Sequence, residues 1–146
     1  MFLDSGVLIE GLLSSWSASR GVLILGRCGL FRIVLANDVR REVEENLTDL
    51  LSVEPVLADE AIATYDKLLR LLNPEWIGAT SDAEVERHRH LIRHAADVPI
   101  LVAALKARPT WLVTTNTRHF NGAVAARTGL QICTPHHLIA RIHVLR

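Results

Sequence analysis

Polar side chains able to bind a metal ion stand where two short apolar runs of this sequence end. Asp4 follows an apolar pair at the start of the chain, and Asn116 follows the run Trp111–Thr114 with Thr115 between them. If both runs are parallel strands, these side chains face the crevice beyond the carboxyl ends of the strands, where α/β proteins bind ligands. The alternative is that each is only a turn or helix-capping residue.

Two further regions add carboxylates to this set. Where Val39 and Val43 begin an apolar repeat at helical spacing, Glu42 and Glu44 fall at opposite borders of the apolar face, and periodicity does not choose between them. Asp97 precedes Val98-Pro99, so we expect a helix that begins at the proline and leaves Asp97 outside its first turn. The alternative for each carboxylate is a solvated position without a catalytic role.

Carboxylates drawn from several elements, with no basic partner adjacent in sequence, are hard oxygen ligands suited to Mg²⁺ or Mn²⁺. Carboxylates that share one cleft repel each other, and a divalent cation removes that cost. Such an ion polarises a phosphodiester and lowers the pKa of a bound water. The pattern therefore predicts metal-assisted phosphodiester hydrolysis.

A run of three arginines and three histidines lies just upstream of Asp97 and is the strongest local basic patch in the sequence. It could hold RNA phosphates near the metal site, and the alternative is a solvated helix face. His90 and His94, four residues apart, could form half of a transition-metal site, but no second pair is evident. Arg118 and His119 follow Asn116 and are candidates for substrate contact. The arginines of the patch are Arg87, Arg89 and Arg93.

Short apolar runs alternate with longer helical patterns, which is typical of βαβ units and a parallel sheet. We expect strands at 2–3, 31–35, 76–77, 111–114 and 131–133. We expect helices at 7–16, from an Asn37 or Asp38 cap to about residue 50, at 56–72, 81–93, 99–105 and 117–127, and from Pro135 onward. The three tryptophans each adjoin an apolar run and are expected in the core: Trp16, Trp76 and Trp111.

Composition bounds the class of protein. With 146 residues, 49% hydrophobic and 22% charged, the chain is expected to be one globular domain over residues 1–146, which excludes intrinsic disorder. Sixteen basic and sixteen acidic residues give no net charge, which argues against a strongly basic nucleic-acid binder. Two separated cysteines predict reduced thiols and a cytoplasmic protein, and no apolar run approaches the roughly 20 residues of a membrane span.

Four segments, in their order and spacing, resemble the motifs of the PIN domain family. They are Phe2-Leu-Asp-Ser-Gly-Val-Leu-Ile9, Arg41-Glu-Val43, Ala96-Asp-Val-Pro-Ile-Leu101 and Leu112-Val-Thr-Thr-Asn-Thr-Arg-His-Phe120. The resemblance spans nearly the whole chain, and its specificity lies in the ordered set. It implies a three-layer α/β/α fold with a central, mainly parallel sheet of four to five short strands.

The resemblance also implies site residues and an activity. PIN domains are typically ribonucleases that depend on Mg²⁺ or Mn²⁺, and many small members are VapC-type toxins neutralised by an antitoxin. Asp4, Glu42 rather than Glu44, and Asp97 match the three acids that would hold the metal. Asn116, with Thr115 beside it, falls where the family often has a fourth acid. An amide adds no charge, so binding of a second metal ion is expected to be weaker.

We therefore predict a divalent-metal-dependent endoribonuclease that acts on single-stranded or structured RNA, as the toxin of a toxin–antitoxin pair. Its expected partners are RNA, an antitoxin and a second copy of the chain, with no membrane. The alternative is a catalytically weak or inactive PIN-like module that binds RNA or protein. A doubly wound small-molecule binder would need a glycine-rich loop after the first strand, and the segment Asp4-Ser-Gly-Val supplies one glycine.

Overall fold

A computed structural model describes residues 1–144 and contains one five-stranded sheet in the order β3-β2-β1-β4-β5. Every neighbouring pair of strands is parallel. The central strands β1 and β4 are buried on both faces, which is why their sequences are continuously apolar rather than alternating. The strands are β1 (Phe2–Leu3), β2 (Val34–Ala36), β3 (Glu75–Ile77), β4 (Leu112–Val113) and β5 (Ile132–Cys133).

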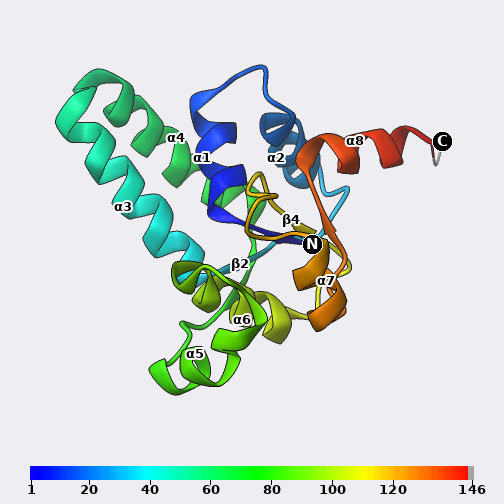
Figure 1. The fold of residues 1–146 in the computed structure, drawn as a ribbon. Coiled ribbons are helices and arrows are strands. Elements are labelled where there is room, and N and C mark those ends of the chain that lie inside the picture. Colours follow the sequence, from blue (N-terminus) through cyan, green and yellow to red (C-terminus); the bar gives the residue numbers. More distant parts are fainter. Residues whose placement is uncertain (145–146) are drawn as a thin grey trace.

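Helices cover both faces of this sheet and complete the predicted three-layer α/β/α architecture (Figure 1). On one side lie α1 (Ser5–Leu13), α2 (Ala18–Arg27), α3 (Asn37–Val53) and α4 (Pro55–Leu72). On the other lie α5 (Asp82–His88), α6 (Val98–Ala107) and α7 (Gly122–Thr128), with the short 3-10 helices η1 (Arg89–Leu91) and η2 (Ala95–Asp97) between α5 and α6. The last helix, α8 (Pro135–Val144), packs against α2.

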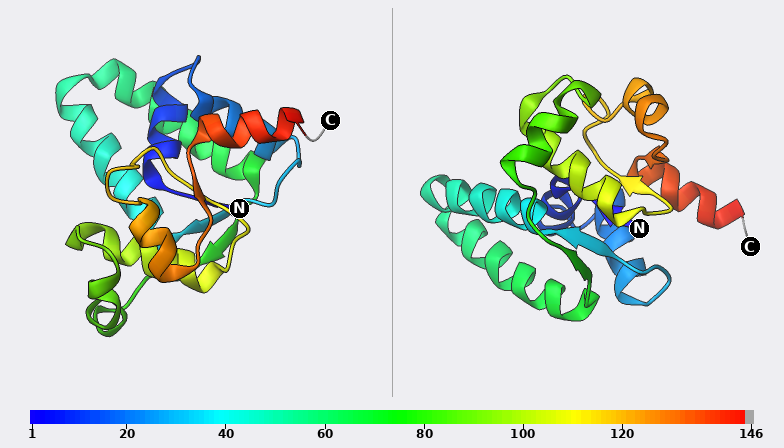
Figure 2. Two further views of the ribbon diagram at one scale, coloured as in Figure 1. Left: turned by 45° about the vertical axis from the view of Figure 1, so that its right-hand side comes forward. Right: turned by 90° about the horizontal axis from the view of Figure 1, so that it is seen from below.

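The long helices α3 and α4 form an antiparallel pair that projects from the body of the molecule (Figure 2). Pro55 starts α4 at its first turn, and Asn73 ends it in the left-handed conformation. A capping box starts α5, because Ser81 accepts from Glu84 N–H while the Glu84 side chain accepts from Ser81 N–H. No helix in the described part of the chain has the length and apolarity of a membrane span.

Two predicted helices are shorter in the structure. The helix expected over 81–93 ends at His88, because Ile92 adopts an extended conformation and is buried in the core. The helix expected over 117–127 begins at Gly122, because Asn121 caps it by accepting from the backbone N–H groups of Ala123 and Val124. Residues 89–91 form the 3-10 helix η1 instead, and residues 117–119 form a turn.

Three local expectations are wrong. The helix α3 has Ala36 at its N-cap, because the Asp38 side chain is buried and accepts from Thr80 N–H at 2.8 Å instead of capping. Trp16 is 97% exposed and Trp76 is 39% exposed, so neither belongs to the core. Trp111 does pack against the core, with the Arg141 guanidinium 4.7 Å from its ring centroid.

Candidate active site

The carboxyl ends of β1, β2 and β4 share one edge of the sheet, and the predicted site residues gather there. Asp4 follows β1, the helix carrying Glu42 follows β2, and the turn carrying Asn116 follows β4. A cleft of about 460 Å³ opens at this edge, and Glu42, Asp97 and Asn116 line it together with His94 and His119. The parallel topology therefore places side chains from distant parts of the sequence around one cavity.

Asp4 is a buried carboxylate, only 4% exposed, and it accepts hydrogen bonds from Ser5 and Thr114. Its Oδ1 accepts from Ser5 N–H at 2.8 Å and from the Ser5 hydroxyl at 3.3 Å, and its Oδ2 accepts from the Thr114 hydroxyl at 2.5 Å. Burial raises the pKa of Asp4, and the charge of Asp97 raises it further, while these hydrogen bonds oppose the shift. Asp4 is thus both the cap of α1 and a fixed carboxylate whose charge is costly without a cation.

Glu42 is half-buried on α3 and belongs electrostatically to the same group. Burial raises its pKa most, the negative charges of Asp4 and Asp97 add to the rise, and the Ser5 hydroxyl opposes it. Glu44, the alternative left open by helical periodicity, is exposed and forms an ion pair with Arg40 at 2.7 Å. The structure therefore brings Glu42, and not Glu44, to the acids at the sheet edge.

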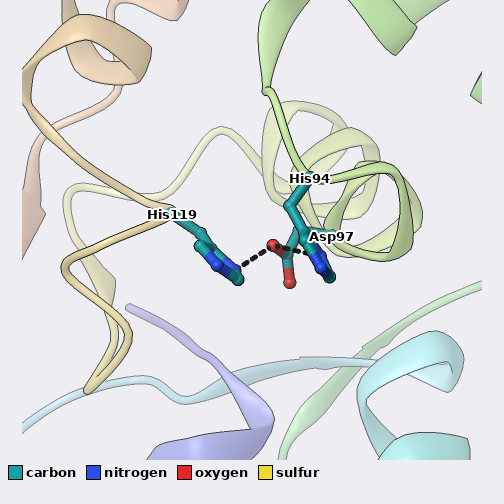
Figure 3. Close-up of side chains that lie close together, drawn as sticks. All are labelled: His94, Asp97 and His119. Atoms are coloured by element: carbon teal, nitrogen blue, oxygen red, sulfur yellow. Dashed lines mark ion pairs between the residues drawn. The ribbon is translucent and has the colours of Figure 1, made fainter.

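Asp97 ends η2 and is the N-cap residue of α6, although its side chain makes no capping hydrogen bond. The helix begins at Val98, one residue before the expected start at Pro99, because Val98 is itself helical. Its Oδ2 lies 2.7 Å from Nδ1 of His119 and 3.2 Å from Nδ1 of His94. Figure 3 shows the carboxylate reaching between the two imidazoles. This oxygen is buried, and neither imidazole contact has hydrogen-bond geometry, so the carboxylate is close to two rings without a donated hydrogen bond.

The turn after β4 fixes Asn116 and His119 relative to Asp4. The Thr114 hydroxyl, which donates to Asp4, also accepts from Asn116 N–H at 2.9 Å. The Asn116 amide oxygen accepts from His119 N–H at 3.3 Å, and its Nδ2 donates to Nδ1 of His119 at 2.9 Å. Thr115 is exposed, and the absence of a side chain at Gly6 lets its hydroxyl approach α1 closely.

The histidines meet in a way that differs from the sequence prediction. His90 and His94 do not form a pair one helical turn apart, because α5 has ended at His88 before either of them. His94 instead stacks on His119, with ring centroids 4.3 Å apart and ring planes at 18°. The nearness of His94 to His119 has no signal in sequence spacing, because it depends on how η2 and the turn after β4 pack.

The arginines predicted to contact substrate divide into two groups. Arg93 and Arg118 line a second hollow, of about 590 Å³, together with Arg127, which no sequence motif singles out. His94 and His119 line both this hollow and the acidic cleft, so the two are adjacent. Arg87 and Arg89 are exposed and line neither cavity. Arg89 pairs with Glu86 at 3.6 Å, as on a solvated helix face.

One set of potential metal ligands is tightly clustered among the described residues. His94, Asp97 and His119 each offer an atom, and these atoms lie within 4.8 Å of one another. The three predicted acids do not meet that spacing as a set, although their charges raise the pKa of Asp4 and of Glu42. Asp97 belongs both to this cluster and to the three predicted acids, so a cation bound near Asp97 would offset negative charge in both sets.

Comparison with known proteins identifies a family to which the chain is similar. No curated protein is similar to this chain. A family model described as PIN domain matches residues 1–118, a range that includes Asp4, Glu42, Asp97 and Asn116. PIN domains are generally nucleases and typically use divalent metal ions. The motif match runs from β1 to the turn after β4, through the same parallel sheet that gathers the acids, and it establishes that this chain belongs to the PIN domain family.

Proposed function

We propose that this protein hydrolyses phosphodiester bonds of RNA with a divalent ion, Mg²⁺ or Mn²⁺, held by Asp4, Glu42 and Asp97. The observation that carries the proposal is electrostatic. Three carboxylates from three separate elements meet at one sheet edge, where burial raises the pKa of Asp4 and of Glu42 most, the charge of Asp97 adds to both shifts, and the charge of Asp4 adds to that of Glu42. Such mutual repulsion persists in a fold where something offsets it, and a divalent cation does so with oxygen ligands.

These residues suit a divalent ion because they offer carboxylate oxygens and because Asp4 is held in place by hydrogen bonds. Asp4 is held by donors from Ser5 and Thr114, so its carboxylate needs little reorganisation on binding. Glu42 and Asp97 line the open cleft, so an ion that they hold would be accessible to substrate. A bound divalent ion would polarise the phosphodiester and lower the pKa of the attacking water.

The adjacent basic hollow supplies a place for the rest of the substrate. Arg93, Arg118 and Arg127 surround it, and the two histidines at its border also line the acidic cleft. Guanidinium groups bind phosphate oxygens in a bidentate manner. An RNA strand whose phosphates occupy this hollow would lead directly into the cleft, which supports single-stranded or locally opened RNA as substrate.

The test is cleavage of a panel of single-stranded and hairpin RNAs by purified protein with Mn²⁺ or Mg²⁺, with and without EDTA. Asp4→Asn removes the buried carboxylate charge, and Asp66→Asn, on the exposed side of α4, is the matched control. We expect cleavage by the wild type and by Asp66→Asn, and loss by at least about 100-fold in Asp4→Asn. Equal products from wild type and Asp4→Asn would contradict the proposal.

One observation favours a second function, RNA binding without efficient hydrolysis. The Asn116 amide contributes no charge to the cleft, and its oxygen already accepts one hydrogen bond, from His119 N–H. Calorimetry separates the two functions, because a hydrolytic site needs to retain Mg²⁺ or Mn²⁺ and a binding module does not. RNA binding with no measurable metal binding would favour the second function.

We extend the proposal to a toxin neutralised by a partner protein. The end of the α3–α4 pair exposes four apolar side chains, a surface suited to an antitoxin or a second copy of the chain. These residues are Leu51, Val53, Val56 and Leu57. Expression of the wild type is expected to arrest growth of the host, and Asp4→Asn is expected to relieve the arrest. Growth arrest that persists in Asp4→Asn would separate toxicity from the proposed hydrolysis.

A further inference from the structure

We propose that His94, Asp97 and His119 form a binding site for a transition-metal ion of the Zn²⁺ or Co²⁺ class. This site goes beyond the proposed hydrolysis and does not depend on it, since binding is defined without RNA. The two histidines come from different parts of the chain, one between η1 and η2 and the other from the turn after β4. Their side chains and that of Asp97 converge at the border between the acidic cleft and the basic hollow (Figure 3).

The distances suit a single ion. Oδ2 of Asp97 lies 2.7 Å from one Nδ1 and 3.2 Å from the other, and all three atoms lie within 4.8 Å of one another. Metal bonds of about 2.1 Å to nitrogen and oxygen separate neighbouring ligand atoms by roughly 3 to 3.5 Å. Only side-chain adjustments are therefore needed to place the three atoms around one ion, and the backbone can stay where it is.

The hydrogen-bond pattern explains why these atoms face one another. The Asn116 amide is oriented by accepting His119 N–H at its oxygen, so its Nδ2 lies 2.9 Å from Nδ1 of His119, a contact that an ion bound at this nitrogen would replace. The same ring nitrogen faces the carboxylate oxygen of Asp97 at 2.7 Å, and that oxygen is buried without a hydrogen-bond partner. A buried carboxylate oxygen without a hydrogen-bond partner is costly, and a cation beside it would offset that cost.

The chemistry of the ligands selects the class of ion. Two imidazoles and one carboxylate suit Zn²⁺, Co²⁺ and Ni²⁺, whereas Mg²⁺ prefers oxygen ligands alone. The second shell is partly built, because Asn116 holds the backbone of His119 and Asp97 is fixed by its position between η2 and α6. The two rings stack at 4.3 Å, which holds both imidazoles beside Asp97, and the rings must turn about their side-chain bonds to direct both Nδ1 lone pairs at one ion.

The competing occupant is a proton. If His119 or His94 were protonated, the contacts with Asp97 would be ordinary ion pairs and no metal would be needed. The experiment therefore measures metal binding directly, on protein without a histidine tag that has been stripped with EDTA and dialysed at neutral pH. Co²⁺ is the probe, because its visible absorption reports nitrogen ligands and low coordination number, and Zn²⁺ is used to displace it.

Variants locate the ion. His94→Gln and His119→Gln each remove one imidazole, and His94 is exposed enough for its replacement to leave the fold intact. His90→Gln is the matched control, since His90 lies in η1 and outside the cluster. Glu42→Gln separates this site from the three-acid site, because Glu42 belongs only to the latter. Far-ultraviolet circular dichroism checks that each variant is folded.

We expect one Co²⁺ per chain in the wild type, displaced by Zn²⁺ and not by equal Mg²⁺. Each cluster variant should bind Co²⁺ at least about tenfold more weakly and lose the absorption band, while His90→Gln and Glu42→Gln retain both. The proposal is overturned by absence of Co²⁺ binding in the wild type. It is also overturned if Glu42→Gln loses the ion while both histidine variants keep it. Failure of RNA cleavage leaves these readings unaffected, so the two proposals are tested separately.

Discussion

Thr114 is the residue on which the geometry of the proposed site most depends. It is fully buried at the end of β4, and its hydroxyl donates to Asp4 Oδ2 at 2.5 Å and accepts from Asn116 N–H at 2.9 Å. One hydroxyl therefore joins the acid after β1 to the turn after β4. Thr114→Val keeps the shape of the side chain and removes both hydrogen bonds.

The magnitude follows from the two groups left without partners. An unsatisfied buried polar group costs about 1–3 kcal/mol, so the carboxylate oxygen and the backbone N–H together predict a loss of about 3 kcal/mol in the free energy of unfolding. For a chain of this length that is a fall of roughly 6–12 °C in Tm. Thr114→Ser retains the hydroxyl and loses one methyl group, so we expect it to cost about 1 kcal/mol.

Urea and thermal denaturation in EDTA measure the loss, and pH supplies a second check. The Thr114 hydroxyl opposes the rise in the pKa of Asp4, so its removal raises that pKa further. Loss of the hydroxyl therefore destabilises the protein more when Asp4 is ionised than when it is protonated. The difference in the free energy of unfolding between wild type and Thr114→Val should narrow as pH falls and Asp4 becomes protonated. The reasoning is refuted if Thr114→Ser is as destabilised as Thr114→Val, or if the gap does not change with pH.

Three other changes have defined outcomes. Burial and neighbouring charges raise the pKa of Glu42 in the folded state, so ionisation of Glu42 lowers the stability of the protein as pH rises. Urea denaturation in EDTA should therefore find Glu42→Gln more stable than wild type at pH 7 and equally stable in acid. Gly6→Ala should lower Tm, because a Cβ there overlaps the Thr115 hydroxyl, whereas Gly122→Ala meets no neighbour and should not. Arg127→Gln should weaken RNA binding and flatten its dependence on salt, while Arg87→Gln, outside the basic hollow, should do neither.

Local sequence rules predict the fold well because its elements are delimited by local chemistry. The capping box at Ser81, the left-handed Asn73 and the glycine that ends α7 each act within a few residues of their own position. The rules fail where a distant contact decides. Asp38 is placed in the sequence like a helix cap, yet its side chain is buried and accepts from Thr80 N–H. Ile92 continues a helical pattern in the sequence, yet it is extended in the structure and buried in the core.

The same distinction divides the site. Asp4 and Asp97 could be predicted, because a strand end and a proline-bounded helix start fix where each carboxylate lies. The choice of Glu42 over Glu44 came from the family resemblance, and the structure supplies its reason, since Glu44 is held on the outside by Arg40. His119 is different, because the segment that carries it was predicted as helix and is a turn.

The neutral net charge of the chain conceals a local separation of charge. Acids gather at the carboxyl edge of the sheet, arginines line the hollow beside them, and His94 and His119 stand at the border of both. The net charge counted from the sequence does not reveal this arrangement, because it treats all charged residues alike. The exposed Glu86–Arg89 ion pair and the buried Asp97 carboxylate, one oxygen of which has no hydrogen-bond partner, enter the count in the same way. Electrostatic attraction for RNA is therefore expected to act at short range, from the hollow, and a phosphate held there would lie next to the carboxylates that could bind a metal ion.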